Sequence, residues 1–306
     1  MVPMAGYATT RYTETNGISG GLDRAVRCSK TIHGDTLVPM PAETPSLHKS
    51  YQAHPDAWKL LALPMPCKTV RGPKTVRQAL GYFYTHPFGA HMAHFQPLRF
   101  AGHAVDPATA ELGDNFNPIT HQELVAKTAA LVIAHGLRNG GPLALTKEQT
   151  ALALFAAGIH DADEVTHRDV WRHCGNTIGD IKHGNKTPKQ REQLATVRDF
   201  VFKTVFPYLP QPARAIVESV IDKKPNDSPE RKLAVDVFTA AHLMVECETG
   251  LRAGQACLAA DADTTQPLLA LYKEVMSNTL EPLGSYGHFT FVQRFVAQAE
   301  LVRPPR

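Results

Sequence analysis

Apolar residues recur at helical spacing almost without interruption from about residue 118 onward. His121 and His135 fall on the same helical face as the small and apolar residues between them, because these positions are spaced three, four, seven, eleven and fourteen residues from His121. The following run is apolar on nearly all sides, and Thr146 with Gln149 forms a capping-box pattern in front of it. The pattern therefore predicts an amphipathic helix followed by a buried central helix.

The remainder of the chain continues this helical pattern. One predicted helix begins at Ser228, which is followed by Pro229 at the first helical position, and ends at Gly250. The further helices expected after the central one cover 187–206, 212–221, 229–249, 265–278 and 288–301. Patterns typical of strands are scarce, so we predict an all-α fold.

The first 90 residues have a different character. Residues 1–57 are rich in Gly, Pro, Thr and Ser and show no sustained period, which is typical of irregular structure, and only 58–63 and 74–84 have helical patterns. Residues 68–77 repeat the sequence KTVR on either side of Gly-Pro. This basic pair is typical of a solvated face with a turn, and a phosphate-contacting patch is the less favoured interpretation. We therefore expect an N-terminal extension of unknown role over 1–90 and a helical domain over 91–306.

Composition narrows the functional classes. A formal net charge of +3 in 306 residues gives no support for bulk nucleic-acid binding. The five cysteines are widely spaced and odd in number, which argues against a disulfide framework. The N-terminus lacks the apolar region of a secretory signal, and no stretch has 18 uninterrupted apolar residues. We therefore expect a cytoplasmic protein without a membrane span.

Several residues of the metal-ligating types fall on apolar helix faces. His160 and Asp161 end the buried helix, where a charged group is costly unless it is paired or binds a cation. His121 lies on the apolar face of the preceding helix, and Asp236 lies among apolar neighbours within the helix at 229–249. Glu164 follows His160 by one turn, on the same side of the helix. Together these residues predict a site for one divalent cation.

The order of these residues, H…HD…D on helices, resembles the HD-domain phosphohydrolases. HDADE at 160–164 is similar to the HD-x-x-E branch, which includes bacterial 5′-deoxynucleotidases and phage deoxynucleoside triphosphate hydrolases. The resemblance covers about 118–250 and implies an HD-type helical bundle with nucleotide phosphohydrolase activity. It implies His121, His160, Asp161 and Asp236 as ligands of Mn, Co, Fe, Zn or Mg.

The same resemblance suggests roles for further residues. Glu164 is expected to act as general acid or base, and Asp169 to position the nucleophile. The expected phosphate-binding residues are Arg99, Lys182 and Lys186. The chain departs from the branch at Thr120 and Gln122, on either side of the first histidine, where the branch usually has a glutamate and a serine or threonine.

Two other classes of function stay open at this point. An HD fold that has lost catalysis can act as a nucleotide-sensing module, and the KTVR pair is the only feature that favours a nucleic-acid-binding module. We expect a nucleotide substrate, do not expect nucleic acid as a partner, and leave homo-oligomerisation open. His135, His173 and His242 are interpreted as structural or surface histidines, and the weaker cluster around His91 and His94 has no accompanying carboxylates.

Overall fold

A computed structural model of the chain describes residues 44–69, 71–92, 118–162, 188–223, 228–259, 273 and 276–302. All of these residues belong to one compact unit, 41–306. Within these ranges the regular structure is helical, and β pairing is limited to two isolated bridges, Pro64 with Thr75 and Leu137 with Phe289. The all-α prediction is confirmed. No helix in the described ranges has the length and apolar character needed to cross a membrane.

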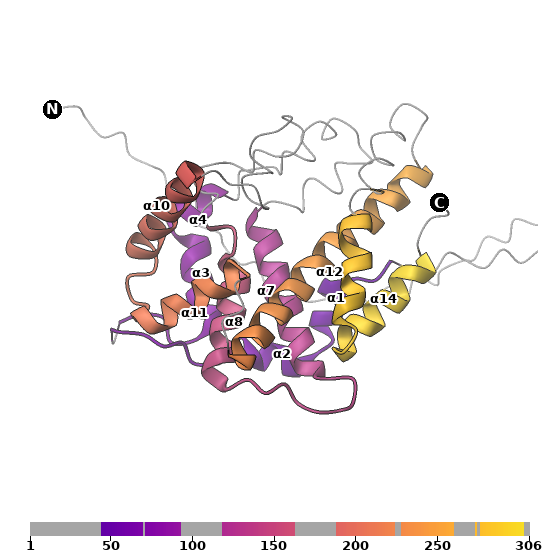
Figure 1. Cartoon of the computed structure of the whole chain (residues 1–306), viewed down its shortest axis with the longest axis horizontal. Coiled ribbons are helices and arrows are strands. Elements are labelled where there is room, and N and C mark those ends of the chain that lie inside the picture. The colour runs from indigo at the N-terminus through magenta and orange to yellow at the C-terminus, as the bar shows by residue number, and fades with distance from the viewer. Residues whose placement is uncertain are drawn as a thin grey trace, which may run out of the picture. The chain divides into compact units, whose positions relative to one another are not determined.

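The helices follow one another along the chain as labelled in Figure 1. They are α1 (Leu47–Gln52), α2 (Pro55–Leu60), α3 (Val76–Thr85), α4 (Pro87–Met92), α7 (Pro118–His135), α8 (Lys147–Ile159), α10 (Pro188–Thr204), α11 (Gln211–Ile221), α12 (Pro229–Ala259), the 3₁₀ turn η3 (Gly284–Tyr286) and α14 (Thr290–Val302). Residues 276–283 are helical as well.

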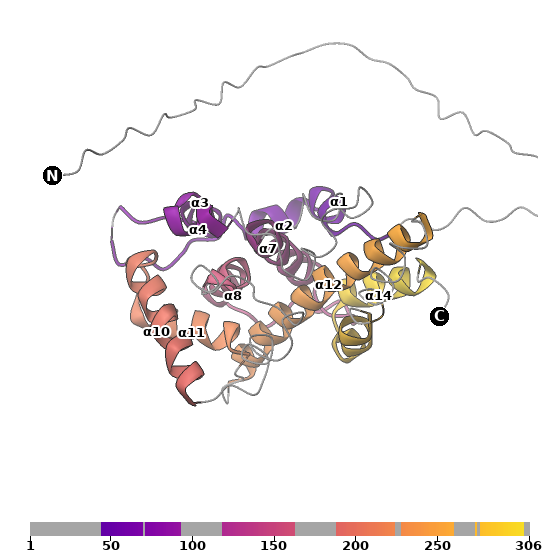
Figure 2. The same ribbon diagram turned by 90° about the horizontal axis from the view of Figure 1, so that it is seen from above.

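The predicted central helix is α8, and it is the most enclosed element. The capping box at its start is present, because the Thr146 side chain accepts a hydrogen bond from Gln149 N while the Gln149 side chain accepts one from Thr146 N. Every residue from Thr150 to Ile159 is buried. Helices α3, α7, α11 and α12 all contact α8, which the view of Figure 2 shows among them.

Two glycines have different roles in the helices at and around α8. Gly158 lets α3 approach α8 closely, because a Cβ at this position would lie 2.4 Å from Cδ2 of Leu80. The Tyr84 hydroxyl donates a hydrogen bond to Gly158 O across the same contact (3.1 Å). Gly136 ends α7 with a positive φ of 66°, the left-handed conformation that glycine adopts without a steric penalty.

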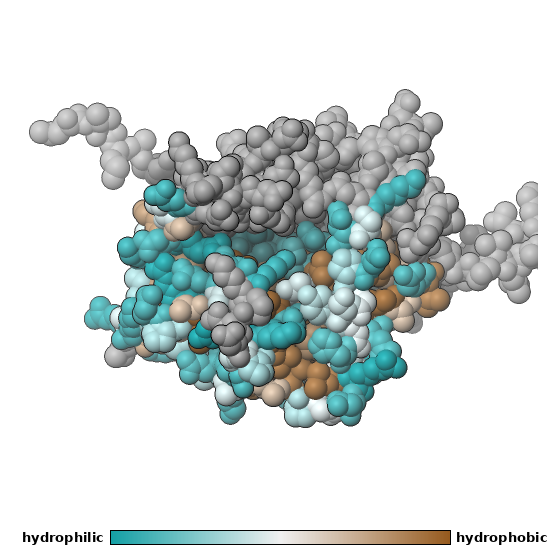
Figure 3. Space-filling view, viewed as in Figure 1, coloured by the Kyte–Doolittle hydropathy of each residue, from teal (hydrophilic) through white to brown (hydrophobic). Residues whose placement is uncertain are grey.

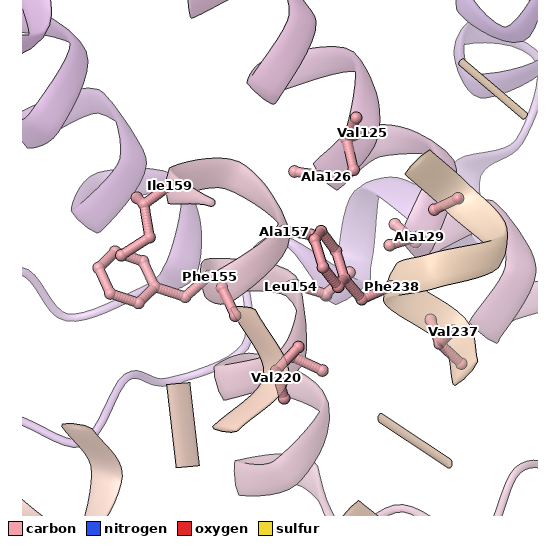
Figure 4. Packing of buried hydrophobic residues seen from close by; sticks show 14 of the residues in the cluster. Val125, Ala126, Ala129, Leu154, Phe155, Ala157, Ile159, Val220, Val237 and Phe238 are labelled. Atoms are coloured by element: carbon pink, nitrogen blue, oxygen red, sulfur yellow. The ribbon is translucent and has the colours of Figure 1, made fainter. Parts of the chain in front are cut away.

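The interior is formed by the faces of α7, α8, α11 and α12 that point toward one another. Figure 4 shows Phe238 of α12 among Ala157 of α8 and Ala129 of α7, with Val220 of α11 nearby. These side chains are at most 2% exposed, and burial of one such Phe or Val is worth about 1.5–3 kcal/mol. The packing of small alanines against a large ring brings three helix backbones close together.

The early helices belong to the same body. Helices α1 and α2 contact α7, and the Leu47 amide at the start of α1 donates a hydrogen bond to the buried Glu248 carboxylate of α12 (3.1 Å). The domain boundary predicted after residue 90 therefore falls inside the compact unit 41–306.

The predicted end of a helix at Gly250 is a second difference, because α12 continues to Ala259. Glu248 and Arg252 form an ion pair across Gly250, and Leu251 is fully buried. The burial of Leu251 and the Glu248–Arg252 ion pair outweigh the cost of a glycine within a helix, which is roughly 1 kcal/mol.

Candidate metal centre

Three imidazoles from three different helices meet in the interior. They are His121 in the first turns of α7, His160 at the C-terminal end of α8, and His242 in the middle of α12. One ring nitrogen of each lies within 4.8 Å of one ring nitrogen of each of the others. The ring centroids are 5.0–5.3 Å apart and every pair is edge-on. We call these three residues the histidine group, and no other set of three or more potential ligands gathers in this way within the described ranges.

The orientation of His160 is set by the backbone of its own helix. Its Nδ1 lies 2.8 Å from Ala157 O, and because a carbonyl only accepts, Nδ1 must carry the proton. In the neutral ring the lone pair is then on Nε2. That atom is buried and makes no hydrogen bond within the described part of the chain. This arrangement, with one ring nitrogen bonded to a backbone carbonyl and the other available, is the one that metal-binding histidines adopt.

Asp161 lies directly against two members of the histidine group. Its Oδ2 is 3.2 Å from Nε2 of His160 and 3.9 Å from Nε2 of His121, and the residue is buried. The lone pair of neutral His160 therefore faces a carboxylate oxygen, which repels it. A proton or a metal cation between the two atoms removes this repulsion.

Gln122 holds the end of α8 in place beside α7. Its side chain is fully buried, its Oε1 accepts a hydrogen bond from the Asp161 amide (3.3 Å), and its Nε2 donates one to Pro118 O (3.0 Å). Gln122 is one of the positions at which the chain departs from the HD-x-x-E branch. Its bonds give it a structural role next to the candidate ligands.

The electrostatics of the site favour a neutral His121 ring. Burial is the main reason that the pKa of His121 lies well below its usual value, and the proximity of His160 and His242 lowers it further. The charges of Asp161 and Glu246 act in the opposite direction but are smaller effects. A ring that stays neutral at pH 7 keeps a lone pair available for a cation.

The sequence predicts a structural or surface role for His242, and the structure instead places it in the histidine group. Phe238, one turn earlier on α12, packs against both His242 and His160, with ring centroids 6.0 and 5.3 Å away. Glu246, one turn later, has Oε2 3.9 Å from His242 Nδ1. The sequence signal that could have identified His242 is the one that identified His121, a histidine on an apolar helix face, here after Ala240 and Ala241.

Asp236, the predicted fourth ligand, is not brought into this group. Its Oδ2 lies 2.6 Å from the Lys232 ammonium, one turn earlier on α12, and its charge raises the pKa of Tyr286, for which burial is the larger cause. The physical reason is the helical period. Asp236 and His242 are six residues apart, which separates their directions by about 120°. The helix therefore directs one toward η3 and the other toward α7 and α8.

The remaining predicted site residues lie outside the described residues. These are the expected acid–base and nucleophile-positioning residues, Glu164 and Asp169, and the expected phosphate-binding residues, Arg99, Lys182 and Lys186. Of the four predicted ligands, the structure brings together His121, His160 and Asp161.

Comparisons with known proteins add no assignment. No protein-family profile matches the chain, and neither a curated protein nor a solved structure matches it. The chemistry of the site therefore rests on its own geometry. Three imidazole nitrogens and one carboxylate can bind one divalent cation, and this donor set suits Zn, Fe or Co better than Mg, which prefers oxygen ligands.

Proposed function

We propose that the protein is a metal-dependent phosphohydrolase of the HD type that acts on nucleotides, with His121, His160, Asp161 and His242 as metal ligands. The carrying observation is the pair of atoms His160 Nε2 and Asp161 Oδ2, 3.2 Å apart, buried, and fixed by the bond from His160 Nδ1 to Ala157 O. A ring nitrogen lone pair and a carboxylate oxygen held this close together can both bind one cation, and the cation would remove the repulsion between them. His242 replaces Asp236 in the ligand set that the sequence resemblance implies.

The donor set supports a transition metal as the resident ion. Imidazole ligands suit Zn, Fe and Co, and one carboxylate alone is a poor site for Mg. We therefore rank Zn, Fe, Co and Mn above Mg. When bound, such an ion supplies a Lewis acid that makes hydroxide available from a coordinated water near neutral pH.

The chain's own residues would perform the remaining steps. The rings of His121, His160 and His242 and the Asp161 carboxylate would hold the ion, and Gln122 keeps the end of α8 at a fixed distance from α7 through its two hydrogen bonds. The resemblance assigns proton transfer to Glu164 and positioning of the nucleophile to Asp169. It assigns the substrate phosphate to Arg99, Lys182 and Lys186.

The substrate class and the location belong to the same proposal. The resemblance supports (deoxy)nucleotides, hydrolysed at a phosphate ester or anhydride. A cytoplasmic location fits this class of substrate and the wide spacing of the cysteines.

The proposal is tested by phosphate release from a panel of deoxynucleoside mono- and triphosphates, with Mn²⁺, Co²⁺ or Zn²⁺ added to metal-free protein. With a transition metal present, we expect phosphate release either from the monophosphates or from the triphosphates. Asp161→Asn should reduce the rate by more than about 100-fold, since the loss of even an outer-shell partner of a metal ligand costs about 10–100-fold. No release with any nucleotide, from protein shown to hold metal, would contradict an enzyme and favour the nucleotide-sensing alternative.

Glu164 separates catalysis from metal binding. Glu164→Gln should reduce kcat by about 10²–10⁴-fold, the usual contribution of general acid–base catalysis, and leave the metal content unchanged. The measurement is single-turnover hydrolysis with metal analysis of the same sample. A Glu164→Gln protein with the wild-type rate would remove Glu164 from the mechanism.

A further inference from the structure

A long stretch of the chain contains no acidic residue. No aspartate or glutamate occurs between Asp56 and Asp106, whereas six lysines and arginines do. The described part of this stretch includes most of the connection between α2 and α3, in which Pro64 pairs with Thr75 and the Met65 amide donates to Lys74 O (3.0 Å). We call the described residues 64–69 and 71–75 of this connection the basic loop. Its surroundings in the sequence offer no local carboxylate to neutralise it.

The cations of this region differ in what they do. Arg77, at the start of α3, is used structurally, because its guanidinium bonds to Trp58 O and to the Tyr51 side chain. Lys68 and Arg71 are exposed, and neither forms an ion pair or a side-chain hydrogen bond with any described residue. These two exposed side chains of the basic loop therefore make no ion pair within the described part of the chain.

Aromatic rings form a row beside the basic loop. Tyr82 lies 5.9 Å from His86, His86 lies 5.3 Å from Phe88, and Phe88 lies 5.6 Å from Phe200, as distances between ring centroids. We call these four residues the ring row. Tyr82 is 44% exposed and Phe200 is 48% exposed, although apolar rings of this size are usually buried.

The basic loop and the ring row are joined through Tyr208. The Lys68 amide donates to Tyr208 O (2.7 Å), and Gly72 packs next to the Tyr208 side chain. The Tyr82 ring stands edge-on against the buried Tyr208 ring at 5.9 Å. The basic loop and Tyr82 of the ring row therefore meet at Tyr208. The described surface over α10 and α11, at the left of Figure 3, is largely hydrophilic.

The acid that precedes Phe200 in the sequence does not oppose an anionic partner. Asp199 precedes Phe200 on α10, and its carboxylate is paired with Lys203 (2.7 Å) and Arg214 (3.1 Å). These two cations also hold the pKa of Asp199 below its usual value. The charge next to the ring row is thus already compensated within the protein.

We propose that the basic loop and the ring row form a binding surface for single-stranded nucleic acid. Lysine and arginine bind the phosphate backbone, and exposed rings stack with bases, which is the combination that single-strand-binding surfaces use. A duplex exposes its phosphates but not the faces of its bases, so it can bind the cations of this surface but cannot stack on the rings. The overall charge of +3 does not favour a nucleic-acid partner, and the proposal depends instead on this local arrangement.

The test is fluorescence anisotropy of labelled oligo(dT) and oligo(rU) of about 20 nucleotides with the full chain. It is performed in EDTA over about 0.05–0.3 M KCl, so that failure of the proposed metal site does not affect it. Lys68→Glu/Arg71→Glu should weaken binding by at least about tenfold and reduce the log–log salt slope by about 1.4, because each lost phosphate contact on a single strand contributes about 0.7.

Ring variants probe stacking separately from charge. Tyr82→Leu and Phe200→Leu keep an apolar side chain, so the fold is preserved. Each should weaken single-strand binding by about fivefold or more without changing the salt slope. The matched control is Arg138→Glu/Lys147→Glu, an equal change of charge at two exposed residues in and after the α7–α8 connection. This control should retain wild-type affinity within about threefold.

Three results would overturn the proposal. The first is no anisotropy change with wild-type protein up to about 100 µM at the lowest salt, which is weaker than ordinary nonspecific binding. The second is an equal loss of binding in the Arg138/Lys147 control. The third is equal affinity for a duplex of the same length together with unchanged binding by both leucine variants, which would show a general polyanion surface.

Discussion

Helix α7 has a histidine near each end, and each lies against other histidine rings. Near its start, His121 meets His160 and His242 with ring centroids 5.1 and 5.3 Å away. At its end, His135 meets His54 at 4.4 Å. The two regions share residue type and close contact, so the difference between them shows what a metal site requires beyond neighbouring imidazoles.

The difference lies in the groups around the rings. Asp161 brings a carboxylate to the first region, and Ala157 O fixes which nitrogen of His160 carries the proton. Among the described residues the second region has no such carboxylate, and the lone pair of its one fixed ring nitrogen, His54 Nδ1, is already used in a hydrogen bond. His54 Nδ1 accepts a bond from the Ala57 amide as the N-cap of α2, and His135 stacks flat on Phe291. There the rings serve helix capping and packing.

The largest effect is expected when a ligand of the histidine group is removed. His160→Ala should weaken Zn²⁺ or Co²⁺ binding by more than about 100-fold, because the loss of outer-shell partners alone costs about 10–100-fold. His135→Ala serves as the matched change at the other end of α7 and should bind metal like the wild type. Isothermal titration of metal-free protein measures both. Equal losses in the two variants would mean that the two regions do not differ as described.

Removal of the ion should lower the thermal stability of the fold. At a free metal concentration about 100 times Kd, binding stabilises the folded state by about 2.7 kcal/mol, so EDTA should lower Tm by roughly 5–10 °C. Scanning calorimetry with and without added metal measures this. The His160→Ala protein should show no such shift, and a full shift in that variant would place the stabilising ion elsewhere.

Asp236 and His242 give a comparison within one helix. His242→Ala should lose metal, whereas Asp236→Asn should keep it and lose only the ion pair with Lys232. That pair is largely exposed on the lysine side, so its loss should cost less than about 1 kcal/mol. Metal content by elemental analysis and urea unfolding test the two parts. Loss of metal in Asp236→Asn with metal retained in His242→Ala would restore the ligand set implied by the sequence.

The smallest effect concerns the pH dependence of stability at the second region. Burial chiefly, and then the nearby His54 and Arg294, lower the pKa of His135. As the pH falls below about 6.5, His135 becomes protonated in the unfolded chain but stays neutral in the folded chain. The free energy of unfolding therefore decreases as the pH falls through this range. His135→Gln should therefore show a flatter urea midpoint between about pH 7 and 5 than the wild type. An unchanged slope in His135→Gln would count against this assignment.

Helix boundaries were predictable wherever local chemistry set them. The capping box at Thr146 and the apolar pattern between His121 and His135 placed α8 and α7 nearly to the residue. Gly250 failed as a helix end because the contacts that outweigh it, the Glu248–Arg252 pair and the burial of Leu251, depend on neighbours rather than on local preference. Short helices such as α1 have too few residues to show a period.

The candidate site was predictable in part for the same reason. His160 and Asp161 were identified because a polar pair at the end of a buried helix needs a partner. Asp236 and His242 occupy one long helix that is apolar on several faces, so the sequence alone did not show which face meets α7 and α8. Asp236 was predicted as a ligand because a carboxylate in the middle of an apolar helix needs a partner. In the structure that partner is the Lys232 ammonium, one turn away.

Anomalous X-ray diffraction from crystals of the protein loaded with Zn²⁺ or Co²⁺ shows directly which side chains bind the ion. A single strong peak is expected in the interior, about 2.0–2.2 Å from one nitrogen each of His121, His160 and His242 and from an oxygen of Asp161. Asp236 should remain paired with Lys232, outside the coordination shell. A peak coordinated by Asp236 without His242, or no peak at the histidine group in metal-saturated crystals, would contradict the proposed ligand set.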